Sequence, residues 1–340
     1  MRPLVSIIIL SYNSRRYIEK CLDSVLRQTY LNFEVFVVMN GSVDGSAELV
    51  QSRYGREKRV KILTPGKNLW YSRGNNFAIE QSAGEYILAL NQDTILEPDF
   101  LSEMVAVMQE DPTLGSATGK MYHYKFDIDS KTTILDSTGI EMFRTRRVID
   151  RGQWEIDSRQ YDDELYVFGA SGAGALYRKS ALEVTKLPKA EHGFEYFDED
   201  FTAYKEDVDL SWRLQLAGYR CRYVPSAVMY HGRMVGRSWP TEFIRFILNR
   251  RRQSRDVRKL SFKNHYLMMI KNELPSLFWR HILYIFIREF LLLSYTVLFE
   301  QFQFFALRDF FRQLPSAWRK RALVMAKRKV PASGLLALFH

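Results

Sequence analysis

Residues 86–93 read Tyr86-Ile-Leu-Ala-Leu90-Asn91-Gln92-Asp93, an apolar run that ends in two amides and a carboxylate. An uninterrupted apolar run is typical of a parallel strand that is buried on both faces. Polar groups at the carboxyl end of such a strand open into the crevice where α/β sheets bind ligands. Asn91 and Asp93 offer oxygen atoms that suit Mg²⁺ or Mn²⁺. We therefore expect a site for a cation and a nucleotide diphosphate, which the distant Glu206, Asp207 and His231 could complete.

The first 120 residues alternate between strand-like and helix-like patterns. One helix is expected to start near Ser14, a favoured N-cap residue, and another at Pro98, a favoured first-turn residue. This alternation predicts an α/β fold with a mostly parallel, Rossmann-like central sheet and flanking helices. The expected strands lie near residues 4–10, 33–38, 59–63, 85–90 and 115–119.

The following hundred residues are less regular. Residues 120–165 are polar, which predicts edge strands and mobile loops that could form part of an acceptor cleft. The small residues within 167–177 allow either close approach of a ligand to the backbone or tight packing of one strand. Residues 206–217 are expected to form a helix stopped by Gly218. Two short strands are expected at 220–224 and 227–231.

The composition favours a folded intracellular protein. The 340 residues are 46% hydrophobic and 14% aromatic, which supports a real core and argues against disorder. With only two cysteines, Cys21 and Cys221, a reducing compartment is favoured over secretion. The apolar run 4–10 lacks a cleavage site for a signal peptide and is better explained as a first core strand.

The basic charge is concentrated in the last hundred residues. Residues 237–340 hold 20 Lys or Arg and 6 Asp or Glu, a net charge of +14, whereas the remainder carries −4. A basic cluster lies at 250–259, and residues 282–299 are almost wholly apolar except for Arg288 and Glu289. A charge at mid-bilayer costs about 2.5–3.5 kcal/mol. A helix in the membrane interface is therefore preferred over a spanning one, and a helix packed on the preceding domain is the alternative.

Five motifs follow one another along the chain: residues 5–13 (VSIIILSYN), 40–46 (NGSVDGS), Asn68 with 74–76 (GNN), 91–93 (NQD) and 206–210 (EDVDL). In this order the sequence resembles the family 2 glycosyltransferases, most closely their bacterial rhamnosyltransferase-like branch. The resemblance covers about residues 4–232. It implies a GT-A catalytic domain over residues 1–236, followed by a basic, aromatic-rich helical tail over 237–340. It also implies a nucleotide-sugar donor held through a divalent cation, and transfer of the sugar with inversion.

The same resemblance implies which residues bind the donor. Tyr12 would lie against the nucleobase, or it could be a partly buried aromatic residue at a strand end. Arg73 could contact the diphosphate, or it could be a solvated charge on a helix. The expected nucleotide-sugar-binding residues are Ser11, Tyr12, Asn13, Asn40, Asp44, Asn68, Arg73, Asn75 and Asn91.

One position departs from the pattern. Members of the family usually have Asp where this chain has Met39, and that Asp accepts a hydrogen bond from a pyrimidine base. Methionine cannot accept one with comparable strength. The identity of the donor nucleotide is therefore left open.

Asp93 corresponds to the last position of a DXD-type motif and is expected to bind Mn²⁺ or Mg²⁺, which would neutralise charge on the departing diphosphate. His231, at the end of an expected strand, would be a second ligand. Alternatively, Asp93 is only a capping residue before Thr94. His231 could likewise be an ordinary hydrogen-bonded polar residue at the end of a strand.

Glu206 and Asp207 resemble an ED motif. Adjacent helical side chains diverge by about 100°, so the two should not share one task. Asp207 is the candidate general base, Glu206 would orient an acceptor or a neighbouring cation, and Asp209 would support the helix. The alternative is that these acids only stabilise the helix dipole, at roughly 0.3–1 kcal/mol each.

These inferences predict an inverting, metal-dependent glycosyltransferase of the hexosyltransferase type, with rhamnose one candidate sugar. The expected acceptor is a hydroxyl of a cell-surface glycan or a lipid-linked precursor in polysaccharide or cell-wall synthesis. The expected location is the inner face of the cell membrane, bound peripherally to anionic lipid, and an oligomer is compatible with the sequence. A nucleotidyltransferase acting on a sugar phosphate is the alternative enzyme class. It should carry a Gly-rich basic loop just after the first strand, but residues 11–14 read SYNS, which counts against it. A nucleic-acid binder is disfavoured because its motifs are absent.

Overall fold

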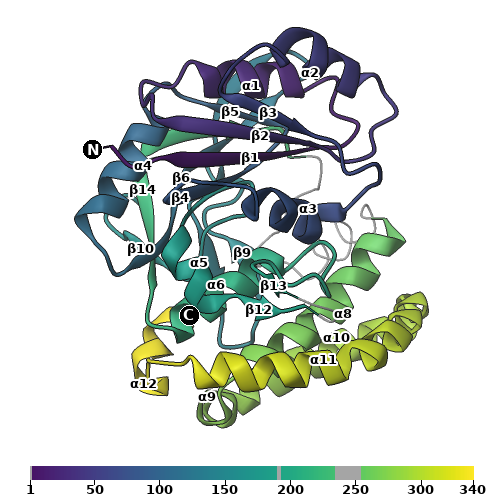
Figure 1. The fold of residues 1–340 in the computed structure, drawn as a ribbon. Helices are drawn as coiled ribbons and strands as arrows, with labels where there is room; N and C mark the ends of the chain where they lie inside the picture. Colours follow the sequence, from purple (N-terminus) through teal and green to yellow (C-terminus); the bar gives the residue numbers. More distant parts are fainter. Residues whose placement is uncertain (1, 190–192, 234–253) are drawn as a thin grey trace.

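The computed structural model describes residues 2–189, 193–233 and 254–340 and is built around one ten-stranded sheet (Figure 1). Its strand order is β10-β14-β6-β11-β4-β1-β2-β3, with β5 paired to β14 and β7 paired to β6. Strands β3, β2, β1 and β4 are mutually parallel neighbours. The four strands predicted in this half are confirmed to within one residue at each end: β1 (Val5–Ser11), β2 (Phe33–Met39), β3 (Val60–Leu63) and β4 (Tyr86–Asn91).

The other half of the sheet is mixed. β11 (Gly174–Arg178) runs antiparallel between β4 and β6 (Leu114–Lys125). β14 (Arg220–His231) runs parallel to β6. The prediction of two strands at 220–224 and 227–231 was wrong, as was the end of a strand at 119. Because β6 continues to Lys125, it pairs with both halves of β14, and only a register shift between Val224 and Val228 marks the interruption.

Residues 120–165 contain edge strands, as predicted, and some polar residues of this segment are buried. Asp136 and Arg146 are fully buried. The strands here and at the sheet edge are β5 (Thr94–Leu96), β7 (Ser130–Ser137), β8 (Ile140–Met142), β9 (Val148–Asp150) and β10 (Tyr166–Val167), and a separate small pair is formed by β12 (Leu187–Pro188) and β13 (Phe194–Glu195).

Helices cover both faces of the sheet, which confirms the predicted α/β class. Buried side chains of α1, α2 and α4 pack on one face, and those of α3, α5 and α6 pack on the other. The helices are α1 (Ile18–Leu26), α2 (Ser46–Tyr54), α3 (Trp70–Ile79), α4 (Phe100–Glu110), α5 (Lys179–Thr185) and α6 (Glu206–Leu216).

The predicted helix starts at Pro98 and Ser14 were wrong, and α4 begins at Phe100, two residues after Pro98. Ser14 is not the N-cap of α1, because the helix starts at Ile18 and the Ser14 hydroxyl lies 2.7 Å from that of Ser11. The predicted stop after α6 is confirmed. Gly218 has φ +91°, a left-handed conformation that suits glycine just beyond a helix end.

The C-terminal residues form helices that pack under the sheet domain (Figure 1). A shared apolar cluster joins α6 to α8 and α11, with Trp212, Leu267 and Val324 among its members. The boundary predicted at residue 236, and Arg250–Arg252 of the basic cluster, lie outside the described residues. The elements are α8 (Arg255–Asn272), α9 (Pro275–Arg280), α10 (Ile282–Phe299), η1 (Gln301–Phe305), α11 (Ala306–Ala326), α12 (Ala332–Leu335) and η2 (Leu336–Leu338).

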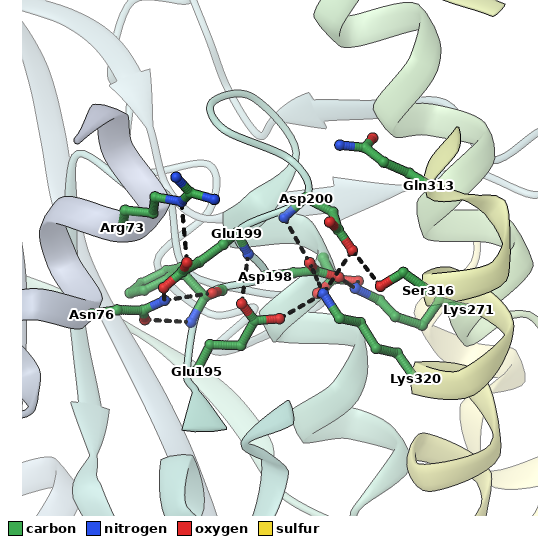
Figure 2. A network of polar contacts seen from close by, with 12 residues as sticks. Arg73, Asn76, Glu195, Asp198, Glu199, Asp200, Lys271, Gln313, Ser316 and Lys320 are labelled. Atoms are coloured by element: carbon green, nitrogen blue, oxygen red, sulfur yellow. Dashed lines mark hydrogen bonds and ion pairs between the residues drawn. The ribbon is translucent and has the colours of Figure 1, made fainter. Parts of the chain in front are cut away.

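A buried ionic network reinforces this packing (Figure 2). Lys320 of α11 lies 2.5 Å from Asp198 and 2.7 Å from Asp200, in the loop between β13 and α6. Lys271 of α8 pairs with Asp198 and lies 2.8 Å from Asp209 of α6. Because the loop leads directly into α6, the C-terminal helices are tied to the segment that carries the candidate base.

Candidate functional site

Two predicted metal ligands meet at the carboxyl ends of β4 and β14. β5 pairs antiparallel with the end of β14 and places His231 opposite Thr94. The Gly232 amide then donates to the Asp93 carbonyl at 2.8 Å. As a result His231 Nε2 lies 3.4 Å from Asp93 Oδ1 and 3.4 Å from the Asn91 amide nitrogen. Side chains 138 residues apart along the chain are thus brought together by strand pairing.

A third residue, Asp136 of β7, orients the histidine. Its Oδ2 lies 2.7 Å from His231 Nδ1, and its Oδ1 lies 2.6 Å from Arg233 Nε. A carboxylate on one ring nitrogen fixes the imidazole so that the other nitrogen can serve as a metal ligand. Asp136 could not be found from the sequence, because it lies in a polar stretch without a motif and reaches the site only through the pairing of β7 with β6.

The electrostatics of the pair favour opposite charges. Burial opposes charge on His231, but Asp93 and Asp136 outweigh it and raise its pKa to about 10. Burial likewise opposes charge on Asp93, and His231 outweighs it, so the pKa of Asp93 lies below its usual value. A divalent cation would therefore replace the proton on His231 and neutralise the same carboxylate.

The residues present fit Mn²⁺ or Mg²⁺ in part. A carboxylate oxygen and an imidazole nitrogen are suitable donors, but within the described residues no group of three or more His, Cys, Asp or Glu side chains is arranged to hold a metal ion. Oxygen atoms of a bound diphosphate would have to complete the coordination. The pair is therefore suited to a cation that arrives with a phosphorylated ligand.

Asp207 stands at the start of α6 on the same edge of the sheet. Its Oδ2 accepts a hydrogen bond from the Gly172 amide at 3.0 Å. The next carbonyl, that of Ala173, accepts a hydrogen bond from the backbone N–H of Asn91 at 3.0 Å. The segment 172–173 therefore links the catalytic candidate directly to the end of β4. Burial, and then the charge of Asp150, raise the pKa of Asp207, while the Gly172 amide opposes the shift.

Small residues in the segment 167–177 serve packing. A Cβ at Gly172 would lie 3.2 Å from Asp207 Oδ2 and 3.0 Å from the Tyr71 hydroxyl. A Cβ at Gly169 would lie 2.1 Å from the hydroxyl of Ser211 in α6. Of the two alternatives left open by the sequence, close packing of this segment against α6 accounts for both glycines, and at Gly172 it allows Asp207 to reach the backbone.

The side chains of Glu206 and Asp209 have different surroundings from that of Asp207, as their spacing along the helix predicted. Glu206 is buried, and burial together with the charge of Asp207 raises its pKa to about 8. Its Oε2 has no hydrogen-bond partner in the described part of the chain. Asp209 is fully buried and binds Arg213 at 3.0 Å and Asn272 at 2.7 Å, so it supports the helix. The role of Glu206 toward an acceptor stays a prediction.

The loop after β1 presents Tyr12 at the surface. Its side chain is 46% exposed, and its backbone is held on both sides by the Gln92 amide, at 2.6 and 3.0 Å. Asn13 Oδ1 accepts the Val43 amide at 3.1 Å, which ties this loop to the one after β2. An exposed aromatic ring on a fixed backbone beside the end of β4 is suited to stacking on a base.

The family of this chain follows from a comparison with known proteins. A model described as "Glycosyl transferase family 2" matches residues 6–185, which is more than half of the sequence. The chain belongs to glycosyl transferase family 2. This assignment confirms the resemblance drawn from the five motifs, although the rhamnosyltransferase-like branch stays a prediction.

Curated relatives of this family 2 chain are mostly longer. The uncharacterized protein y4gI of Sinorhizobium fredii is 30% identical over 77% of this chain and 28% of its own length. Chondroitin synthase of Pasteurella multocida is 32% identical over 42% of the chain and 16% of its own length. Poly-beta-1,6-N-acetyl-D-glucosamine synthase of Staphylococcus aureus is 28% identical over 66% of the chain and 49% of its own length. The chain therefore spans less than half the length of these relatives.

Solved structures confirm the GT-A fold. Residues 1–349 of Staphylococcus aureus TarS give a TM-score of 0.56 at 18% identity, covering 95% of this chain and 88% of that one. The mannosyltransferase PcManGT from Pyrobaculum calidifontis, solved with GDP-Man and Mn²⁺, gives 0.52 at 18% identity, covering 99% and 79%. At this identity the likeness concerns the fold alone.

Several donor-binding candidates of this family 2 chain have their side chains engaged internally. Asn40 Oδ1 accepts the Leu69 amide at 2.6 Å, and Asn68 Oδ1 accepts the Trp70 amide at 2.7 Å. The Asn75 amide is buried and donates to the Tyr71 carbonyl at 3.0 Å. These three side chains shape the loop before α3 and its first turn. Direct contact with the donor stays a prediction for each of them.

The remaining donor-binding candidates differ in their burial and in the contacts that their side chains make within the protein. Asp44 accepts the amides of Ser46 at 3.1 Å and Arg15 at 2.9 Å, which fixes the start of α2. Ser11 is buried. Arg73 is largely exposed and pairs with Glu199 at 3.1 Å. Met39, at the departure from the family pattern, is buried and belongs to the apolar core.

Proposed function

We propose that this chain is an inverting, metal-dependent glycosyltransferase that moves a sugar from a nucleotide-diphosphate donor to a hydroxyl group. The observation that carries the proposal is the meeting of Asp93 and His231 at 3.4 Å, on the sheet edge that also holds Asp207. A bound Mn²⁺ or Mg²⁺ would supply neutralisation of the leaving diphosphate. PcManGT with GDP-Man and Mn²⁺, and TarS with UDP-GlcNAc, support a donor and a cation of these classes.

The protein's own residues supply the other steps. Asp207, with its raised pKa, takes the proton of the acceptor hydroxyl as that oxygen attacks the anomeric carbon. The sugar passes through an oxocarbenium-like state. A single displacement on the face opposite the diphosphate inverts the anomeric configuration. Rhamnose is one candidate sugar, and a hydroxyl of a surface glycan or of a lipid-linked precursor is the candidate acceptor.

Donor binding is expected to depend on the cation. In calorimetry with guanosine-, uridine- and deoxythymidine-linked sugars, one class should bind with Mn²⁺ and lose affinity in EDTA. Asp93→Ala should weaken the Mn²⁺-dependent binding by at least roughly 100-fold, since loss of an outer-shell partner alone costs 10–100-fold. Glu48→Ala, in the first turn of α2, is the control and should bind as wild type. Equal binding in EDTA, or by Asp93→Ala, would contradict the metal role.

We further propose a peripheral location at the inner face of the cell membrane. By length and composition, α10 is apolar enough to cross a bilayer. Only 17% of its residues are buried in the protein, so most of this apolar helix is exposed. Arg288 and Glu289 near its centre contact His265 and Tyr266 of α8, so one side of α10 meets the protein, which favours a helix lying in the interface over a spanning one. The net charge of +14 in residues 237–340 complements anionic lipid. Exposed apolar side chains of α9, α10, η1 and α11 include Trp279, Leu283, Phe286, Phe290, Leu298, Phe305, Phe311 and Trp318.

Flotation with liposomes is the test of this location. Wild type should float with anionic vesicles. The double substitution Phe286→Ser, Phe290→Ser should reduce the floated fraction several-fold, because it removes two exposed aromatic rings that would be buried in the lipid. Leu31→Ser removes an equally exposed apolar side chain, 69% accessible, from the loop before β2 and should change nothing. Equal flotation of the double variant and wild type would refute the assignment of this surface to lipid.

A further inference from the structure

Trp70, the first residue of α3, has a backbone conformation that is rare for a bulky side chain. Its φ is +58°, in the left-handed region that glycine adopts readily and tryptophan only at a cost. Asn68 Oδ1 accepts a hydrogen bond from the Trp70 backbone N–H at 2.7 Å. Asn40 Oδ1 accepts one from the Leu69 N–H at 2.6 Å, and Asn40 Nδ2 donates to the Trp70 carbonyl at 3.4 Å. Such strain persists where the surroundings impose it, and it clusters at functional sites.

The indole ring of Trp70 lies outside the apolar core. It is 53% exposed, belongs to none of the core clusters, and makes no aromatic or cation–π contact with a residue that the structure describes. The next residue, Tyr71, differs in this respect, because its ring packs against the core and its hydroxyl donates to the Gly172 carbonyl at 2.6 Å. Core packing therefore does not explain why a tryptophan occupies a position that suits glycine.

Asn40 connects Trp70 to the strand ends where the donor is expected. Asn40 follows β2 directly, and its backbone N–H donates to the Ser11 carbonyl at the end of β1 at 2.8 Å. Tyr12, the exposed aromatic residue considered above for base stacking, comes next after Ser11. Asn40 therefore joins two segments that each carry an exposed aromatic side chain. Both segments lie at the carboxyl ends of parallel strands, where α/β sheets bind nucleotides.

The side chains at the end of β2 are engaged within the protein. Both polar atoms of the Asn40 side chain bind the segment 69–70. Met39 is buried in the core, and a thioether is only a weak hydrogen-bond acceptor. Stacking on an aromatic ring needs no hydrogen-bonding group, because every base has an aromatic face. These observations favour recognition of the donor base through its faces.

We propose that the Trp70 ring stacks on the base of the donor nucleotide, on the face opposite Tyr12. The inference rests on the proposed glycosyl transfer and specifies how its donor is recognised. It gives the strained position a role that glycine could not fill. A tryptophan fixed by two asparagine side chains also suits this role, because a ring on a fixed backbone loses little freedom when it stacks.

Calorimetry in Mn²⁺ tests the stacking role with UDP, GDP and dTDP, and with pyrophosphate, which lacks a base. Wild type should bind at least one of the three nucleotides. Trp70→Gly and Trp70→Asn remove the ring and suit a left-handed backbone. Each should weaken binding of that nucleotide by about 5- to 150-fold, the range that stacking on one base supplies, and leave pyrophosphate binding unchanged. Trp70→Phe keeps an aromatic face and should retain most of the affinity.

Urea unfolding separates a ligand role from a structural one. Because Trp70→Gly relieves the strained backbone and removes no core side chain, its unfolding midpoint should stay close to that of wild type. Arg159→Gly is the matched control. It makes the same backbone change, at φ +65°, on an exposed residue before β10, which pairs with the start of β14 and not with its end at His231. It should leave nucleotide binding unchanged.

The outcomes separate this inference from the proposed function. Equal nucleotide binding by wild type, Trp70→Gly and Trp70→Asn overturns the stacking role. An equal loss of pyrophosphate affinity also overturns it, because the segment would then serve the diphosphate. Each variant is titrated with the nucleotide-sugar as well, and a loss seen only with the sugar attached would assign the ring to the sugar and refute the base assignment. If wild type binds none of the nucleotides in Mn²⁺, the proposed function itself fails, and this inference with it.

Discussion

Asp207→Asn is expected to lower kcat for sugar transfer by roughly 10²–10⁴-fold, the range that general-base catalysis contributes. The amide keeps the shape of the carboxylate and can still accept one backbone hydrogen bond, so the start of α6 should stay in place. It cannot take a proton from the acceptor hydroxyl. The Kd of the nucleotide-sugar should be unchanged, because the donor is expected at Asp93 and His231. Steady-state transfer assays and calorimetry on the same preparation measure both quantities.

Glu206→Gln is the matched control for this prediction. Burial and the charge of Asp207 hold the pKa of Glu206 at about 8, so the side chain is mostly protonated at pH 7 and resembles glutamine. Its substitution should leave kcat within a few-fold of wild type at that pH. If Asp207→Asn turned over normally, Asp207 would be excluded as the base. If Glu206→Gln caused the larger loss, the two roles would be exchanged.

Local patterns were sufficient to predict the first half of the sheet and the residues at its strand ends. The run 86–90 identifies a buried strand, and Asp93 follows from where that strand ends. His231 could be proposed only because family motifs precede it in order. Asp136 could not, since its position depends on strand pairing between β6 and β7, and a register shift there also falls between Met121 and Tyr122.

The contacts of the C-terminal helices with the catalytic domain could not be predicted from local sequence patterns either. Charge counts describe residues 237–340 as a basic tail, which suggests a surface that faces anionic partners. Three of its polar side chains instead point into the catalytic domain. Lys271 and Lys320 are buried against acids that lie 73 and 122 residues away, and Asn264 binds carbonyl groups about 60 residues away. No periodicity or spacing reports pairs at such separations, so only the three-dimensional arrangement distinguishes them from surface charges.

Lys320→Met is expected to destabilise the fold by about 3–5 kcal/mol, the cost of breaking a buried ion pair by removing one partner. Lys320 lies 2.6 Å from Glu195, 2.5 Å from Asp198 and 2.7 Å from Asp200 (Figure 2). Without it, Asp198 would keep its ion pair with Lys271, whereas Glu195 and Asp200 would each lose the ion pair that Lys320 supplies. The urea midpoint of unfolding should fall accordingly, and the loss should appear in one transition that includes the catalytic domain.

Arg312→Met tests whether this effect comes from burial rather than from loss of a charge on α11. Arg312 pairs with Asp309 at 3.3 Å and is 75% exposed, and such surface pairs contribute about 0–1 kcal/mol. Its urea midpoint should match that of wild type. Because Asp198 and Asp200 begin the loop that positions Lys205 and Asp207, a folded fraction of Lys320→Met should also show a reduced kcat. A wild-type midpoint for Lys320→Met, or a separate early transition of the C-terminal helices alone, would show that these helices are an independent appendage and not part of the catalytic fold.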